Sequence, residues 1–116
     1  MIELFNILNG LTVKLLHNTP GQEDFKKGRP LAYPKTDVFI IAFSLVSPTS
    51  LDNIEYMWIP EIQEHCPRTP YILVGLRLSL RDEYISKGWD FVSTAMGEEM
   101  KRKICAAYYI ECDALE

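Results

Sequence analysis

The 116-residue chain lacks any apolar run near the roughly 20 residues that a membrane-spanning helix needs, and its longest, at residues 38–43, has the length of a strand. It has no excess of basic residues. The 12 Lys and Arg against 16 Asp and Glu give a net charge of -4, which argues against nucleic acid or an anionic membrane surface as a partner. Its three cysteines show no CxxC spacing, which indicates a reduced, cytoplasmic compartment. His17 and His65 have no partners at metal-ligand spacing, so we expect no metal site.

Apolar patterning predicts a single α/β domain over residues 1–116. Three apolar runs predict strands, the first two buried on both faces of a sheet: residues 38–43, 71–74 and 108–110. One helix is expected to begin near Ser47 and Pro48, and a second is capped by Ser93 or Thr94. Strands that alternate with helices indicate a mainly parallel sheet with right-handed crossovers.

The remaining segments are less regular. The start of the chain predicts a β-hairpin, because apolar residues lie on both sides of Asn9 and Gly10, the dipeptide that suits a type I′ turn. Residues 18–37 form a long polar connection with three prolines, of a kind that is usually functional or mobile. Pro60 falls inside the first helix and is expected to kink it. Residues 81–93 have an irregular, mixed pattern.

Several short blocks dispersed along the chain carry a more specific signal. They include Gly21-Gln22-Glu23-Asp24-Phe25, Trp58-Ile59-Pro60-Glu61-Ile62, His65-Cys66-Pro67-Arg68-Thr69-Pro70 and Glu111-Cys112. In this order they closely resemble the Rho/Rac family of small GTPases, and the second and third blocks point to the Rho branch. The resemblance implies a Rossmann-like P-loop GTPase fold, GTP or GDP with Mg²⁺ as ligands, and Rho-type regulators or effectors as partners.

The resemblance also implies parts that this sequence does not show. The family begins with a strand, a P-loop and a helix, and no G-x-x-x-x-G-K-[ST] motif occurs in this chain. The family's last helix and lipidated tail are also missing, so we expect an incomplete domain without a membrane anchor. Without the central first strand, the strand expected at residues 11–16 either pairs directly with residues 38–43 or leaves a gap. A homo-oligomer or a partner would then cover that gap.

The resemblance assigns nucleotide-binding roles to positions that are mostly altered. The family's metal-facing Asp-x-x-Gly reads Asn18-Thr19-Pro20-Gly21, which removes a carboxylate that Mg²⁺ favours. Its guanine-reading Thr-Lys-x-Asp reads Leu76-Arg77-Leu78-Ser79, so the carboxylate that pairs with the guanine edge is replaced by Ser79. Its Ser-Ala segment beside the base reads Asp113-Ala114. Arg77 either contacts an anionic ligand or is a solvated replacement of the family's lysine.

Two further groups of positions bear on activity and partners. Gln22 matches the family's water-positioning residue, but it is vestigial without a phosphate to act on. The family's second switch region holds candidate protein-docking residues: Phe25, Arg29, Leu31, Tyr33 and Pro34. Such aromatic and arginine side chains suit an interaction hot spot, although Leu31 and Tyr33 also suit packing against the sheet.

The sequence therefore predicts a Rho-like protein that binds no nucleotide cofactor, has no GTPase activity and acts as a protein-interaction module. The alternative is a GTP-binding and GTP-hydrolysing molecular switch that uses Mg²⁺ and regulates the actin cytoskeleton.

Overall fold

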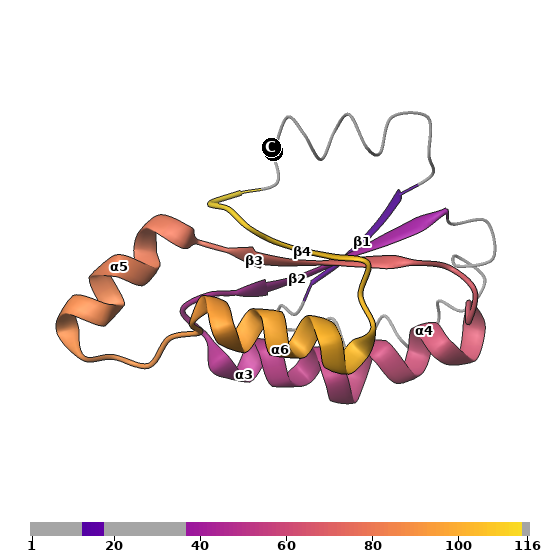
Figure 1. The fold of residues 1–116 in the computed structure, drawn as a ribbon, viewed down its shortest axis with the longest axis horizontal. Coiled ribbons are helices and arrows are strands. Elements are labelled where there is room, and N and C mark those ends of the chain that lie inside the picture. The colour runs from indigo at the N-terminus through magenta and orange to yellow at the C-terminus, as the bar shows by residue number, and fades with distance from the viewer. Residues whose placement is uncertain (1–12, 18–36, 115–116) are drawn as a thin grey trace.

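A computed structural model describes residues 13–17 and 37–114 of the chain. Four parallel strands form one sheet (Figure 1): β1 (Val13–His17), β2 (Val38–Ser44), β3 (Tyr71–Leu76) and β4 (Tyr108–Glu111). Their spatial order, β1-β2-β3-β4, is the order in which they occur in the chain. The predicted α/β class with a parallel sheet is confirmed. The turn and first strand of the predicted hairpin, and most of the long polar connection, lie outside the described residues.

Strands β1 and β2 pair directly with each other. Their parallel register runs from Val13 opposite Val38 to His17 opposite Ala42. Of the two arrangements that the sequence left open, the structure therefore has the closed one, because no gap separates these strands. The argument for a partner that covers a missing strand at this position no longer holds.

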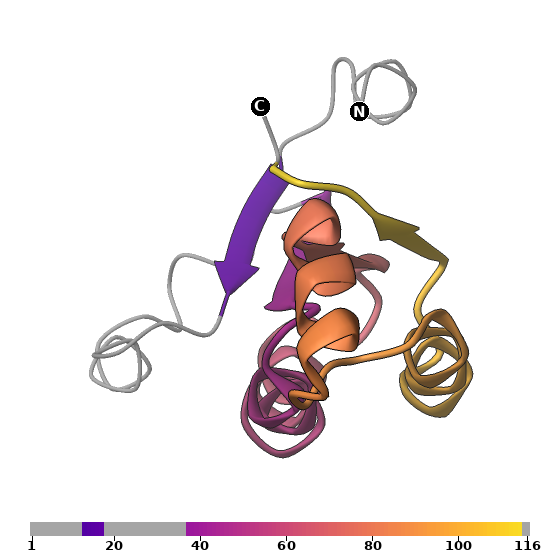
Figure 2. The same cartoon turned by 90° about the vertical axis from the view of Figure 1, so that its left-hand side faces the viewer.

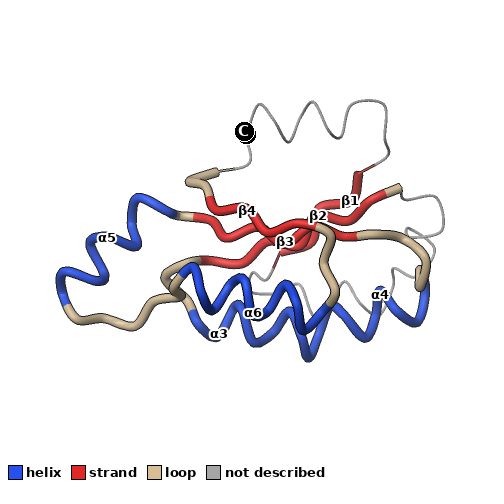
Figure 3. The backbone as a smooth tube through the Cα atoms, in the orientation of Figure 1, coloured by secondary structure: helices blue, strands red, loops and turns tan. Residues whose placement is uncertain are grey.

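The order of the strands determines on which face of the sheet the helices lie. Between β2 and β3 lie α3 (Pro48–Asn53), a π-helical turn η2 (Ile54–Trp58) and α4 (Ile59–His65); between β3 and β4 lie α5 (Leu78–Lys87) and α6 (Thr94–Ile104). Right-handed crossovers that always advance in one direction place their helices on the same face of the sheet. Accordingly, α3, α4 and α6 lie under one face, and α5 extends from the end of the sheet (Figures 1 and 3).

The helical segment between β2 and β3 contains Pro60 and continues past it. Proline has no N–H to donate within a helix, and its ring crowds the carbonyl four residues earlier. The turn just before Pro60 is wound as a π-helix, in which the Ile59 N–H donates to the Ile54 carbonyl. The disruption expected at Pro60 therefore takes the form of one widened turn, a known cause of helix bending.

The core lies on both faces of β2 and β3, as their continuous apolar sequences predict. On the helix-covered face, alternate residues of β2 join apolar side chains of the helices: Phe39, Ile41, Phe43, Leu51, Ile54, Trp58, Ile62, Met100 and Ile104. On the opposite face a smaller cluster consists of Val38, Ile40, Ala42, Ile72 and Val74. All five residues of the smaller cluster are at most 7% exposed, so both faces of the central strands are buried.

Helix α5 is the element that the sequence did not predict. Residues 81–93 were expected to be irregular, but the first seven of them belong to α5. None of its ten residues is buried. Leu78, at its start, packs against the main core cluster, but a helix with no buried residue lacks the apolar stripe by which helices are recognised in a sequence.

Candidate functional site at the carboxyl ends of strands β3 and β4

The positions that the resemblance assigns to binding of the guanine base lie together at the carboxyl ends of two neighbouring strands. Arg77 and Ser79 follow β3, and Asp113 and Ala114 follow β4. In open parallel sheets, ligands bind beyond the carboxyl ends of the strands, which is where these four residues lie. The other assigned positions fall outside the described residues: Asn18, Gly21, Gln22, Phe25, Arg29, Leu31, Tyr33 and Pro34.

Backbone hydrogen bonds join the two loops that follow these strands. The Arg77 N–H donates to the Asp113 carbonyl at 3.3 Å, and the Leu78 N–H donates to the Cys112 carbonyl at 3.2 Å. Arg77 turns the chain from β3 into α5 with a left-handed backbone, at φ 67°. This turn places the first residues of α5 beside Asp113.

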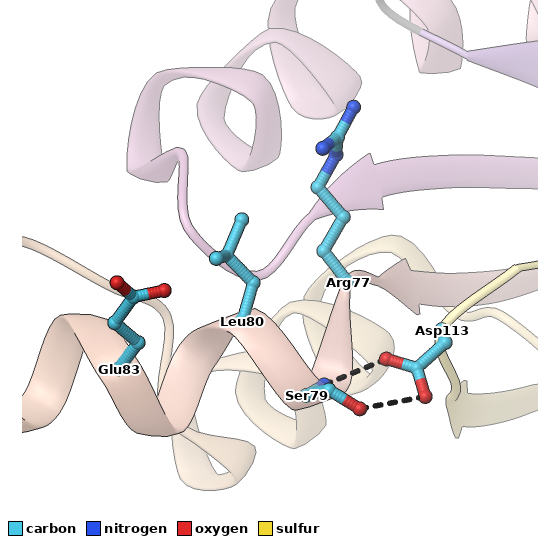
Figure 4. A pocket seen from close by; sticks show the side chains of 5 residues that line it. All are labelled: Arg77, Ser79, Leu80, Glu83 and Asp113. Atoms are coloured by element: carbon cyan, nitrogen blue, oxygen red, sulfur yellow. Dashed lines mark hydrogen bonds between the residues drawn. The ribbon is translucent and has the colours of Figure 1, made fainter.

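The Asp113 carboxylate caps helix α5 from outside the helix. One of its oxygens accepts from the Ser79 N–H at 2.7 Å, and the other accepts from the Ser79 hydroxyl at 2.8 Å (Figure 4). The first N–H groups of a helix have no partner within the helix, and Arg77 provides no side-chain cap, so Asp113 supplies the missing acceptor. These hydrogen bonds from Ser79 lower the pKa of Asp113 below its ordinary value, which keeps the carboxylate ionised near neutral pH.

An open pocket of about 390 Å³ surrounds this pair. Its lining residues are Arg77, Ser79, Leu80, Glu83 and Asp113 (Figure 4). The lining combines one guanidinium with two carboxylates and one aliphatic side chain. Arg77 is exposed here.

The structure shows a relation between Ser79 and Asp113 that the sequence analysis missed. The family has a carboxylate at the position of Ser79 and a hydroxyl at the position of Asp113, and here the two side chains have exchanged places. A carboxylate therefore still stands at this site, although on the other loop. The signal was visible in the sequence, because each altered position holds the type of side chain that the family has at the other.

Both carboxylates of the pocket accept hydrogen bonds from within the chain. Both oxygens of the Asp113 carboxylate already accept hydrogen bonds from Ser79. The second carboxylate in the pocket, Glu83, accepts from the Lys87 ammonium at 3.0 Å. Within residues 13–17 and 37–114, no group of three or more His, Cys, Asp or Glu side chains could hold a metal ion.

A second polar cluster joins α5 to strand β4, and the sequence analysis also missed it. The Arg81 guanidinium donates to both oxygens of Glu111 at 2.9 Å, and it donates to the Val92 carbonyl at 3.0 Å. Glu111 also accepts from the Thr94 hydroxyl at 2.9 Å and from the Tyr109 hydroxyl at 2.6 Å. This network joins α5 to β4 and to the start of α6, so it holds the pocket's helix against the sheet.

Burial and the neighbouring Glu111 carboxylate raise the pKa of Tyr109 far above its ordinary value. The hydroxyl therefore remains a hydrogen-bond donor to Glu111 at any pH in normal use. Every member of the network thus has a partner, as buried polar groups require.

The fold and the site define an α/β protein with a parallel sheet and a polar pocket at the ligand-binding edge of that sheet. The model of the Ras family matches residues 6–116. The chain belongs to the Ras family, whose small GTPases bind GTP or GDP with Mg²⁺. Among the described residues, no helix is long and apolar enough to cross a membrane.

Proposed function

We propose that this Ras-family chain is a Rho-type protein that has lost GTP binding and hydrolysis and acts as a protein-interaction module. The observation that carries the proposal is the Ser79–Asp113 pair. Its two hydrogen bonds, at 2.7 and 2.8 Å, engage both oxygens of the base-side carboxylate in capping α5. A guanine edge would have to share this carboxylate with the start of α5, and it could use only the lone pairs that Ser79 leaves free.

The rest of the sequence supports the same conclusion. Ser79 stands where the family has the carboxylate that pairs with the guanine edge. Asn18 stands where the family has the carboxylate that faces the metal and phosphate. Gln22 can orient a water molecule only against a bound phosphate, so its retention does not imply hydrolysis.

Titration of the full chain with fluorescent GTP and GDP in Mg²⁺ tests the loss of nucleotide binding. We expect no binding tighter than about 10 µM, because that affinity needs about -7 kcal/mol and the chain has Asn18 and Ser79 in place of the two carboxylates that the family turns toward the metal and the guanine edge. The matched variant Ser79→Asp/Asp113→Ser restores the family's order of the two side chains. We expect it to bind more tightly than the natural chain if the exchanged pair weakens recognition of the base, although Asn18 still replaces the carboxylate that faces the metal. A Kd well below 10 µM for the natural chain would disprove the proposal.

We propose that partners bind the switch-II-like loop, residues 21–34, which holds Phe25 and Arg29. Aromatic and arginine side chains dominate interaction hot spots, where a truncation typically costs about 2 kcal/mol or more. We expect Phe25→Ala and Arg29→Ala each to weaken binding to a Rho-type regulator by at least about 10-fold. Tyr56→Ala is the matched control, because Tyr56 is 74% exposed on η2, outside the loop. If the loop variants and the control variant lose the same amount of affinity, partners do not bind at this loop.

A GTP-binding and GTP-hydrolysing switch that regulates the actin cytoskeleton is the second candidate. One observation favours it, namely that a carboxylate is still present at the base side, in the form of Asp113. The same nucleotide titration decides between the two candidates.

We place the protein in the cytoplasm, because Cys66, Cys105 and Cys112 are all free thiols.

A further inference from the structure

The chain holds a half-exposed tryptophan in a fixed position just after α5. Trp89 is 50% exposed. Its N–H donates to the Tyr84 carbonyl at 3.0 Å, and the Gly88 N–H donates to the Ile85 carbonyl at 3.2 Å. These are the two hydrogen bonds of a Schellman motif, which the left-handed backbone of Gly88, at φ 71°, makes possible. The backbone of Trp89 is therefore tied to the last turn of the helix.

The side chain of Trp89 is held as well. The Tyr84 ring meets it edge-on, with ring centroids 5.1 Å apart and planes at 85°. The Lys87 ammonium lies 4.7 Å from the centroid of the Trp89 ring, and the same ammonium pairs with Glu83 at 3.0 Å. An exposed aromatic side chain that is already ordered loses little conformational entropy on binding, and this property is typical of interaction hot spots.

The surroundings of Trp89 combine exposed apolar and acidic side chains. Ile85, in the last turn of α5, is 48% exposed. Asp82 and Asp90 are exposed, and neither forms an ion pair with any described residue. Figure 2 views the molecule from the α5 side, where this helix stands nearest to the viewer. We call Asp82, Ile85, Trp89 and Asp90 the α5 patch.

We propose that the α5 patch binds a basic amphipathic segment of another protein. An apolar side chain of that segment packs on Trp89 and Ile85, and its lysine or arginine side chains pair with Asp82 and Asp90. Charge complementarity selects this occupant, since Asp82 and Asp90 form no ion pair with a described residue, whereas Lys87, which lies over the Trp89 ring, already pairs with Glu83. A second copy of the chain fits less well because its net charge is -4. The patch shares no residue with the segment 21–34, so its variants test it independently of partner binding at that segment.

In the test, peptides from a random library are selected for binding to the full chain. Peptides that also bind the Trp89→Ala variant are removed. Enriched peptides are then synthesised and titrated. We expect them to combine lysine or arginine with aliphatic or aromatic residues and to protect tryptophan fluorescence from acrylamide. This signal reports on Trp89, because Trp58 is only 3% exposed. We expect Kd to rise at least about 10-fold for Trp89→Ala and about 3-fold for Asp82→Asn/Asp90→Asn.

Two variants keep the result interpretable. Trp89→Phe preserves an apolar contact for the Schellman motif and should give an intermediate loss of affinity. Tyr56→Ala removes an exposed aromatic side chain elsewhere and should leave Kd unchanged. The proposal is overturned by the absence of enriched peptides, by enrichment of acidic or uncharged peptides, or by equal binding to Trp89→Ala. It is also overturned if light scattering shows an oligomer that Trp89→Ala dissociates, because the occupant is then a second copy.

Discussion

Replacing Glu111 with alanine is expected to lower the free energy of unfolding by about 3 kcal/mol. The substitution removes the acceptor of four hydrogen bonds, two from Arg81 and one each from Tyr109 and Thr94. The Arg81 side chain is only 12% exposed, so its charge would be left partly buried without an anion. Urea unfolding measures the loss directly, and thermal unfolding should show a melting temperature about 10 °C lower.

Two variants separate this network from an ordinary surface ion pair. Lys87→Ala breaks the exposed pair with Glu83 and should cost less than about 0.5 kcal/mol. Arg81→Met/Glu111→Leu removes both charges together and should recover most of the stability that Glu111→Ala loses. If Glu111→Ala costs no more than Lys87→Ala, the network contributes no special stability.

The pH dependence of stability gives an independent measurement of the same network. Partial burial by itself acts to raise the pKa of Glu111, but the hydrogen bonds from Arg81, Tyr109 and Thr94 outweigh it and hold the pKa below its ordinary value of 4.5. A carboxyl group with a lowered pKa in the folded state stabilises the protein above its unfolded-state pKa, and this stability is lost as the pH falls through the folded-state pKa. The stability difference between the natural chain and Glu111→Gln should therefore be full at pH 7 and shrink progressively in acid.

Replacing Gly97 with alanine is expected to destabilise the protein by about 2 kcal/mol, although helix propensity alone predicts a gain of about 1 kcal/mol. Gly97 is buried in α6, and a Cβ atom there would overlap the end of the Tyr109 ring. The ring cannot move aside without loss. It stacks on Phe43 with centroids 6.2 Å apart, and its hydroxyl donates to Glu111 at 2.6 Å. Urea unfolding of the two proteins measures the sign of the change.

A double-mutant cycle tests the cause. The variant Tyr109→Leu removes the atoms that the new methyl group would meet, so Gly97→Ala should cost much less in that background. Gly88→Ala is the matched control, since a Cβ atom there meets nothing within 4 Å and the cost comes only from its φ of 71°. A gain in stability from Gly97→Ala in the natural chain would show that Tyr109 gives way freely.

The parts of the fold that were predictable are those buried on both sides. Continuous apolar residues identify β2 and β3, because a strand covered on both faces leaves no room for polar side chains. The second predicted helix was also found, since Ser93 caps α6 by accepting from the Met96 N–H at 3.2 Å. This helix buries Gly97, Met100 and Ile104, whereas Met96 is 41% exposed.

The site was only partly predictable for a different reason. Resemblance gave the positions of Ser79 and Asp113, but not that their side chains bond to each other. Residues 34 positions apart become neighbours only when β3 and β4 lie side by side in the sheet. The same holds for Arg81 and Glu111, which are 30 positions apart. Such pairs depend on strand order, and local patterns do not encode strand order.

The strand order of the sheet bears on how the chain folds as the ribosome releases it. Each strand pairs with the one made just before it, so β2 docks on β1, β3 on β2 and β4 on β3. None of these four strands has to enter between two strands that have already paired. The sheet can therefore grow vectorially, one strand at a time, during synthesis. A further strand that arrived later between β1 and β2 would first have to break their ladder from Val13 to His17.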